Sequence, residues 1–318
     1  MGRSSAPNGT TIQRRPRKSS SLGADPRGDT DVGSIATNLP RQKDESTLSP
    51  VSEKSNGRGT RERKRTKAKK LLRRWKRFSL KHTWFMPLVL ILTLLGAYYI
   101  SPGEHNPLHY AIFLSYANPP LNERTNTLPA HIGDVTQYGK GPKDIAFAAF
   151  YTIVFTFTRE FLMQRLIKPV TVWCGIPRGK QSRFMEQSYT ALYFAVFGPL
   201  GLWVMSRTPV WYFNIPGMYE GFPHRAHEAW FKAYYLLQAA YWAQQAIVLM
   251  LQLEAPRKDF KELVLHHMVT LALIALSYRF HFTYMGIAVY VTHDISDFFL
   301  AVSQEIRLSS SNMLTRNY

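Results

Sequence analysis

The chain has 318 residues, 45% of them hydrophobic, with a net charge of +19 and a mean hydropathy of −0.20. Residues 1–83 contain 22 Lys and Arg but only seven Asp and Glu, and so carry +15 of that charge. Because the basic residues stop where long apolar segments begin, anionic lipid headgroups are favoured over nucleic acid as the partner. A single cysteine excludes a disulfide framework and a cysteine-bound metal, and we expect no metal site.

Two polar segments precede the first apolar one. Residues 1–60 are rich in Ser, Gly, Pro and Arg and have almost no aromatic residues, so they bury too little apolar surface to fold. We predict a disordered cytosolic tail here. Residues 61–83 form a polybasic juxtamembrane segment, which we interpret as a cytosolic anchor beside the membrane.

Six apolar segments predict transmembrane helices, since about 20 residues cross a bilayer. The first covers residues 84–101 and is followed by a predicted lumenal loop at 102–143. The other five are residues 144–163, 190–205, 231–253, 261–279 and 282–303. We place them in a core domain of residues 144–305, with a short polar end at 306–318. The pattern predicts an all-α polytopic membrane protein.

The loops between these segments predict the orientation. The loops at 164–186 and 254–262 are rich in Lys and Arg, whereas those at 102–143 and 206–229 are poorer for their length. Loops rich in basic residues stay in the cytosol, so the N-terminus is expected there too.

Five polar side chains lie inside the last two apolar segments. The fifth segment contains His266 and His267, and the sixth contains His293, Asp294 and Asp297. Ionisable groups at membrane depth are costly and usually face a bundle interior or a wet cavity. His293 and Asp297 are spaced i, i+4 and share a helix face, and Asp294 and Asp297 are i, i+3 neighbours.

The short connection between the two segments predicts an antiparallel helix pair. At about 1.5 Å per residue, His266 lies about 8 Å and Asp297 about 9 Å from the cytosolic end. The two groups are therefore expected to meet in the cytosolic half of the membrane. An imidazole beside a carboxylate supports a general base near neutral pH. Adjacent helical residues point about 100° apart, so one histidine should act while the other orients or binds substrate.

The histidine segment resembles a known signature. Residues 266–304, "HHMVTLALIALSYRFHFTYMGIAVYVTHDISDFFLAVSQ", resemble the ceramide synthases, the longevity-assurance branch of the TLC-domain membrane proteins. "YGKGPKDIAF" at 138–147 and "KAYYLLQAAYWAQQ" at 232–245 are similar to the fungal members. The likeness covers residues 80 to 305. It implies a TLC-type helical barrel around a lipid-binding cavity in the endoplasmic reticulum membrane.

The resemblance also implies an activity and its residues. Ceramide synthases transfer a fatty acyl group from acyl-CoA to the amine of a sphingoid base, sphinganine or phytosphingosine. Five catalytic side chains are expected: His266, His267, His293, Asp294 and Asp297. Three basic residues before the histidine pair either bind the acyl-CoA phosphates or serve only as topological anchors: Arg257, Lys258 and Lys261. Acyl-CoA is then a co-substrate, and no bound cofactor is expected.

Two chemical routes stay open from the sequence. A histidine accepts the proton of the attacking amine, or the imidazole attacks first and forms an acyl-histidine. The expected partners are the sphingoid base, acyl-CoA and membrane lipids. A small accessory subunit or a homo- or heterodimer is left open. Arg159 and Glu160 are interpreted as a charged pair for helix packing or pore lining rather than catalysis.

The alternative function is a non-catalytic TLC-domain protein that binds or senses lipids. The two histidines and two aspartates argue against it, because a simple lipid cavity needs no buried acids. The family continues past the signature with at least one more span, whereas this chain stops at Tyr318. We therefore expect a truncated chain or inactive isoform, with little or no activity when it is expressed alone.

Overall fold

The computed structural model describes four stretches of the chain: residues 73–79, 81–124, 128–251 and 260–316, with side chains up to 308. The disorder predicted for residues 1–60 lies outside the described residues. So do Arg257 and Lys258, two of the three basic residues expected to bind acyl-CoA.

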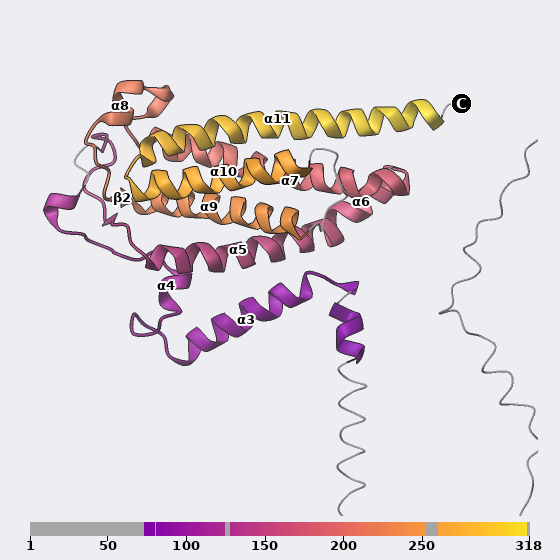
Figure 1. The fold of residues 1–318 in the computed structure, drawn as a ribbon, viewed down its shortest axis with the longest axis horizontal. Coiled ribbons are helices and arrows are strands. Elements are labelled where there is room, and N and C mark those ends of the chain that lie inside the picture. The colour runs from indigo at the N-terminus through magenta and orange to yellow at the C-terminus, as the bar shows by residue number, and fades with distance from the viewer. Residues whose placement is uncertain (1–72, 80, 125–127, 252–259, 317–318) are drawn as a thin grey trace, which may run out of the picture. The chain divides into compact units, whose positions relative to one another are not determined.

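Long helices occur at all six predicted segments, and the prediction of an all-α fold is confirmed (Figure 1). Helices α5, α7, α9, α10 and α11 run side by side, and α3 packs against α5. The long helices are α3 (Phe85–Ile100), α5 (Lys143–Leu162), α7 (Arg178–Ser206), α9 (Ala229–Met250), α10 (Phe260–Arg279) and α11 (Thr283–Arg316). Helix α11 thus continues through the polar end that was expected to follow residue 305.

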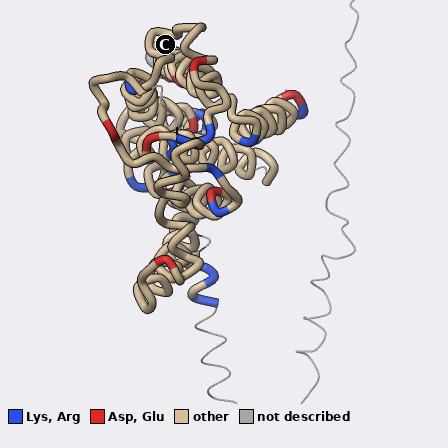
Figure 2. Tube along the Cα trace, turned by 90° about the vertical axis from the view of Figure 1, so that its left-hand side faces the viewer, with Lys and Arg blue, Asp and Glu red and all other residues tan. Residues whose placement is uncertain are grey.

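Four of the six expected spans are long and apolar enough to cross a membrane, among the residues that the structure describes. The other two differ from the expectation. Helix α3 is apolar but has 16 residues, and α9 is long enough but contains Lys232 and several glutamines. The four helical stretches that qualify are Lys143–Trp173, Arg178–Ser206, Phe260–Arg279 and Thr283–Leu308. Most of the bundle is free of charge, and charged residues occur in short stretches (Figure 2).

Short elements join the long helices. The predicted lumenal loop contains α4 (His109–Ile112), the 3-10 helix η2 (Leu121–Glu123) and strand β1 (Gln137–Tyr138). Strand β1 pairs antiparallel with β2 (His227–Glu228), with Tyr138 opposite His227. The remaining short elements are the π-helix η3 (Met163–Ile167), α6 (Lys168–Trp173), the 3-10 helix η4 (Trp211–Phe213) and α8 (Ile215–Tyr219).

Aromatic side chains fill the core between α5, α7, α9 and α11. The rings of Tyr193 and Tyr241 stack with centroids 3.5 Å apart, and Phe155 packs edge-on against both. Glycine permits close approach elsewhere, because a Cβ on Gly201 would overlap the hydroxyl of Tyr234. Helix α10 has no fully buried residue, although its Ile274 and Tyr278 pack against the core.

A buried ion pair fixes the β1 end of the bundle. Lys232 of α9 lies 2.7 Å from Asp144 of α5, and both side chains are buried. The Lys232 ammonium also donates hydrogen bonds to the carbonyls of Ser115 and Gly139, at 2.8 and 2.7 Å. The three N–H donors of the ammonium are therefore all used. Tyr278 of α10 donates to the other oxygen of Asp144 at 2.7 Å, so three helices and the preceding loop meet at this pair.

Candidate functional site

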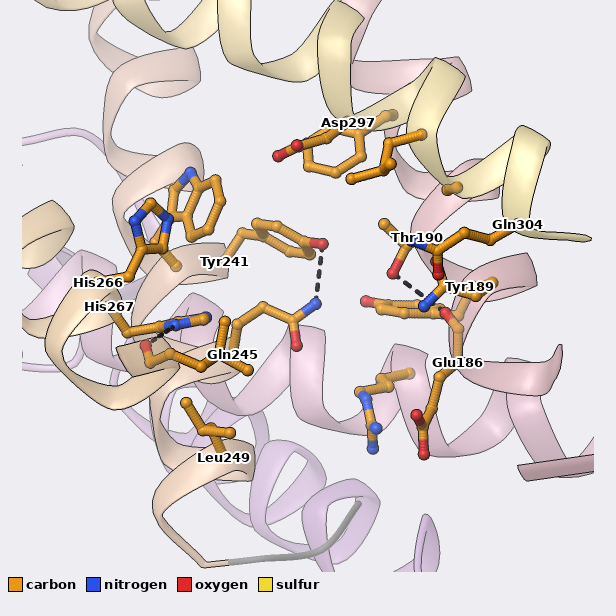
Figure 3. A pocket seen from close by; sticks show the side chains of 17 residues that line it. Glu186, Tyr189, Thr190, Tyr241, Gln245, Leu249, His266, His267, Asp297 and Gln304 are labelled. Atoms are coloured by element: carbon orange, nitrogen blue, oxygen red, sulfur yellow. Dashed lines mark hydrogen bonds between the residues drawn. The ribbon is translucent and has the colours of Figure 1, made fainter. Parts of the chain in front are cut away.

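A polar cavity of about 220 Å³ opens between α7, α9, α10 and α11, with one residue from α5; it is called the histidine cavity below (Figure 3). His266 and His267 form one side and Asp297 another. The structure therefore brings together a histidine pair and an aspartate from two different helices. Other polar side chains that line the cavity are Arg159, Glu186, Gln187, Thr190, Gln245 and Gln304.

The two histidines differ in their surroundings. The Nδ1 atom of His267 lies 2.9 Å from the carbonyl oxygen of Leu263, one helical turn earlier. A carbonyl only accepts, so Nδ1 carries the proton and a neutral His267 has its lone pair on Nε2. Its ring also contacts Trp242 edge-on. The His266 ring is more exposed and stands at 85° to that of His267.

Asp297 lines the same cavity as the two histidines. It is half-buried on α11 and interacts electrostatically with His266 and His293. In Figure 3 its carboxylate points from α11 toward the side of the cavity that His266 occupies. His293, one turn before it, is exposed and does not line the histidine cavity. The i, i+4 spacing predicts that His293 and Asp297 share a helix face, but only Asp297 lines the cavity.

Asp294 lies behind the cavity, in a buried network between α9 and α11. Its side chain is fully buried, and the hydroxyl of Tyr234 donates to it at 2.9 Å. The amide of Gln238 donates to the same oxygen and also to Tyr234. This network fixes α11 against α9 one turn away from Asp297. Three of the five predicted side chains thus line the cavity, with one behind it and one outside.

The sequence reasoning did not identify Tyr234 and Gln238. The available signal was the presence of amides in an apolar helix, since polar side chains at membrane depth usually have buried partners. Gln245 is a second example, because its amide donates to the hydroxyl of Tyr241 at 2.8 Å in the wall of the cavity. Lys261 is exposed at the start of α10 and does not line the cavity.

Arg159 and Glu160 form the expected charged pair near the end of α5. The Nη1 atom of Arg159 lies 2.8 Å from a carboxylate oxygen of Glu160, and Arg159 is only 4% exposed. Arg159 also lines the histidine cavity. The pair therefore serves both packing and cavity lining.

The fold and the site together define a class of membrane protein. The chain is an all-α, multi-pass membrane protein with a polar, histidine-lined cavity between its helices. Comparison with family models adds that residues 183–316 match a TLC domain.

The chain is also similar to several curated fungal proteins. A sphingosine N-acyltransferase of Schizosaccharomyces pombe is 52% identical over 223 residues, 70% of this chain and 54% of the relative. A sphingosine N-acyltransferase-like protein of Gibberella moniliformis is 49% identical over 74% of this chain and 60% of the relative. A ceramide synthase of Saccharomyces cerevisiae is 43% identical over 74% and 55%. The resemblance to fungal ceramide synthases is confirmed, and the chain spans a little over half the length of these relatives.

Proposed function

We propose that this chain is a ceramide synthase, an acyltransferase that joins the fatty acyl group of acyl-CoA to the amine of a sphingoid base. The observation that carries the proposal is the convergence of His266, His267 and Asp297 in one cavity between membrane helices. The similarity to fungal sphingosine N-acyltransferases supports the same reaction.

The cavity has the groups that amide formation needs. A protonated amine is not a nucleophile, so a base must hold the proton while the nitrogen attacks the thioester carbonyl. The Nε2 atom of His267 carries the lone pair of a neutral ring, and Asp297 stabilises positive charge on the neighbouring His266. The C–S bond then breaks, and the thiolate takes up the proton as coenzyme A leaves. Direct attack and an acyl-histidine intermediate both fit these positions.

The remaining assignments concern the place of the reaction. We place the chain in the endoplasmic reticulum membrane with its N-terminus in the cytosol. Arg165, Lys168, Arg178 and Arg183 lie at the end of the bundle that holds the histidine cavity, in line with the positive-inside rule. Acyl-CoA, which is cytosolic and anionic, then reaches the cavity from the inner side. The sphingoid base reaches it from the membrane.

The test is a transfer assay with labelled sphinganine and acyl-CoA in membranes that lack endogenous ceramide synthase. Labelled ceramide is compared with the background of empty membranes. His266→Ala and His267→Ala should each lower the rate by about a hundredfold, the usual contribution of a general base. Met268→Ala on the same helix is the control and should keep the rate, because Met268 is exposed and does not line the cavity.

An unchanged product level in both histidine variants would contradict the proposal. It would favour the alternative of a TLC-domain protein that binds lipids without transferring them. Binding of labelled sphinganine to all three variants, with no labelled ceramide from any chain, is the pattern that this alternative predicts.

A further inference from the structure

A second, basic cavity adjoins the histidine cavity. Its volume is about 420 Å³, and it lies between the segment before α3, the end of α5 with the π-helix η3, and the start of α7. Its cationic side chains are Lys81, Arg159, Arg165 and Lys168, and its acidic ones are Glu160 and Glu186. We call it the basic cavity.

The two cavities share walls. Arg159 and Glu186 line both of them, so the two cavities meet at these two side chains. Gln187, Thr190 and Gln245 also line the histidine cavity, and Figure 3 shows Gln245 between Glu186 of the shared wall and His267 on the opposite side. A molecule seated in both would meet cations first, then uncharged polar side chains, and the histidine pair last.

The cationic side chains of the basic cavity outnumber its acidic ones, and most of them form no ion pair with the residues that the structure describes. Arg159 is paired with Glu160 at 2.8 Å. In the described part of the chain, no acidic side chain forms an ion pair with Lys81, Arg165 or Lys168. Three exposed cations thus gather around one cavity, which is the pattern that binds phosphate groups.

The local backbone holds this wall in place. The π-helix η3 is a rare element that often marks functional sites, and it carries Gln164 and Arg165. The amide of Gln164 donates to the hydroxyl of Thr83 at 2.6 Å, and Thr83 donates to Glu160. The guanidinium of Arg165 lies over the ring of Trp84 at 5.6 Å. The segment before α3 is therefore tied to η3 around the cavity.

We infer that the basic cavity binds the phosphates of acyl-CoA, and that the pantetheine arm passes the wall of Arg159 and Glu186 to bring the thioester to the histidines. This inference rests on the proposed function. Coenzyme A matches the order of surfaces, because it has a phosphorylated nucleotide at one end, a long uncharged arm and a thioester at the other. The assignment replaces the loop before α10 with Lys81, Arg165 and Lys168 as the phosphate-binding residues.

The experiment is a calorimetric titration of the full chain with coenzyme A, in nanodiscs of zwitterionic lipid at low salt. Lys81→Glu and Lys168→Glu should each weaken binding by roughly tenfold or more, because each reverses a charge beside phosphate. Arg307→Glu makes the same charge change outside both cavities and should stay within about twofold of wild type. Pantetheine, which lacks the phosphates, should bind weakly and equally to all four chains.

Any one of the following results would overturn the inference. They are an affinity for coenzyme A that neither lysine reversal weakens, and no binding of coenzyme A to the wild type. A larger loss of affinity in Lys261→Glu than in Lys168→Glu, or pantetheine binding as tight as that of coenzyme A, would count equally against it. A lipid headgroup is the other source of phosphate. If phosphatidylserine in the nanodisc abolishes coenzyme A binding to wild type, the basic cavity is a headgroup site and the inference fails.

These titrations are independent of turnover. Ceramide formation with an unchanged KM for acyl-CoA in Lys168→Glu would refute the inference and leave the proposed function intact. Binding of coenzyme A that depends on Lys168, without ceramide formation, would refute the proposed function and retain the basic cavity as a coenzyme A site.

Discussion

Lys232 is a fully buried cation in the apolar helix α9, and its partners explain how it is tolerated. Asp144 neutralises its charge and two backbone carbonyls take its other donors. Removing one member of a buried ion pair typically costs about 3–5 kcal/mol, because the other charge is left uncompensated. Lys232→Met should therefore lower the melting temperature in detergent by about 6 °C or more.

A second variant separates charge from packing in this case. Lys232→Met combined with Asp144→Asn removes both charges, so the double variant should melt above the single Lys232→Met variant. Melting of the double variant at the sum of the two single losses would show that the ion pair contributes nothing, contrary to this account.

Lys140 lies between β1 and α5, outside the membrane helices, and donates to the hydroxyl of Thr283 at 3.2 Å. Burial, together with the nearby Lys232 ammonium, lowers the pKa of Lys140 from 10.5 to about 7, although Asp144 acts in the opposite direction. Between these values the unfolded chain binds more protons than the folded one, so stability rises with pH. Below about pH 7 Lys140 is protonated in both states, and the folded state is destabilised by the full cost of burying its charge.

We expect the melting temperature to rise by about 2–4 °C between about pH 7.5 and 9.5, and the rise should be smaller in Lys140→Met. Burial lowers the pKa of the neighbouring His224, His227 and His281, so these rings do not titrate in this window. Differential scanning fluorimetry at several pH values measures the effect. Equal slopes for wild type and Lys140→Met would contradict it.

The sequence was sufficient to predict the positions of some site residues but not of others. The spacing of His266 and Asp297 from the same membrane face was enough to predict that they meet, and both line one cavity. The same spacing could not place Asp294, because its position depends on Tyr234 and Gln238 of α9. Which face of α9 meets α11 is set by packing of the whole bundle, and no local pattern in the sequence encodes it.

At the scale of elements, helix α9 is the most informative. Its glutamines and lysine lower its mean hydropathy, yet Lys232, Gln238 and Gln244 are fully buried. Lys232 pairs with Asp144 of α5 and Gln238 donates to Asp294 of α11, so these two polar residues connect α9 to its neighbours. The pair of β1 and β2 was not predicted, because strands of two residues are too short to show an alternating pattern.

Two glycines of α7 allow a matched test of helix packing. A Cβ on Gly201 would overlap the hydroxyl of Tyr234, which holds Asp294, whereas a Cβ on Gly198 meets nothing within 4 Å. Gly201→Ala should lower the melting temperature by about 2–8 °C, as expected for overpacking of about 1–3 kcal/mol. Gly198→Ala should be neutral or stabilising, because alanine favours helix by about 1 kcal/mol. Equal melting temperatures in the two variants would contradict the packing described.

At the scale of the whole molecule, helix order in space departs from helix order in the chain. The sequence predicted α10 and α11 as neighbours, but α11 packs more extensively along α7 than along α10. Hydropathy shows which residues form membrane helices but not which helices pack together. An apolar helix face is as stable against lipid as against another apolar face. The histidine cavity results from this arrangement, because α7 and α9 contribute most of its wall.

The account depends on imidazole and carboxylate acting as one unit across α10 and α11. The most direct measurement is the rate of labelled ceramide formation by His266→Ala, Asp297→Asn and the double variant. Groups that work as a unit are non-additive, so the double variant should be no more than about threefold slower than the slower single variant. Losses that multiply, or a single variant that keeps the wild-type rate, would show that these side chains do not share one catalytic centre.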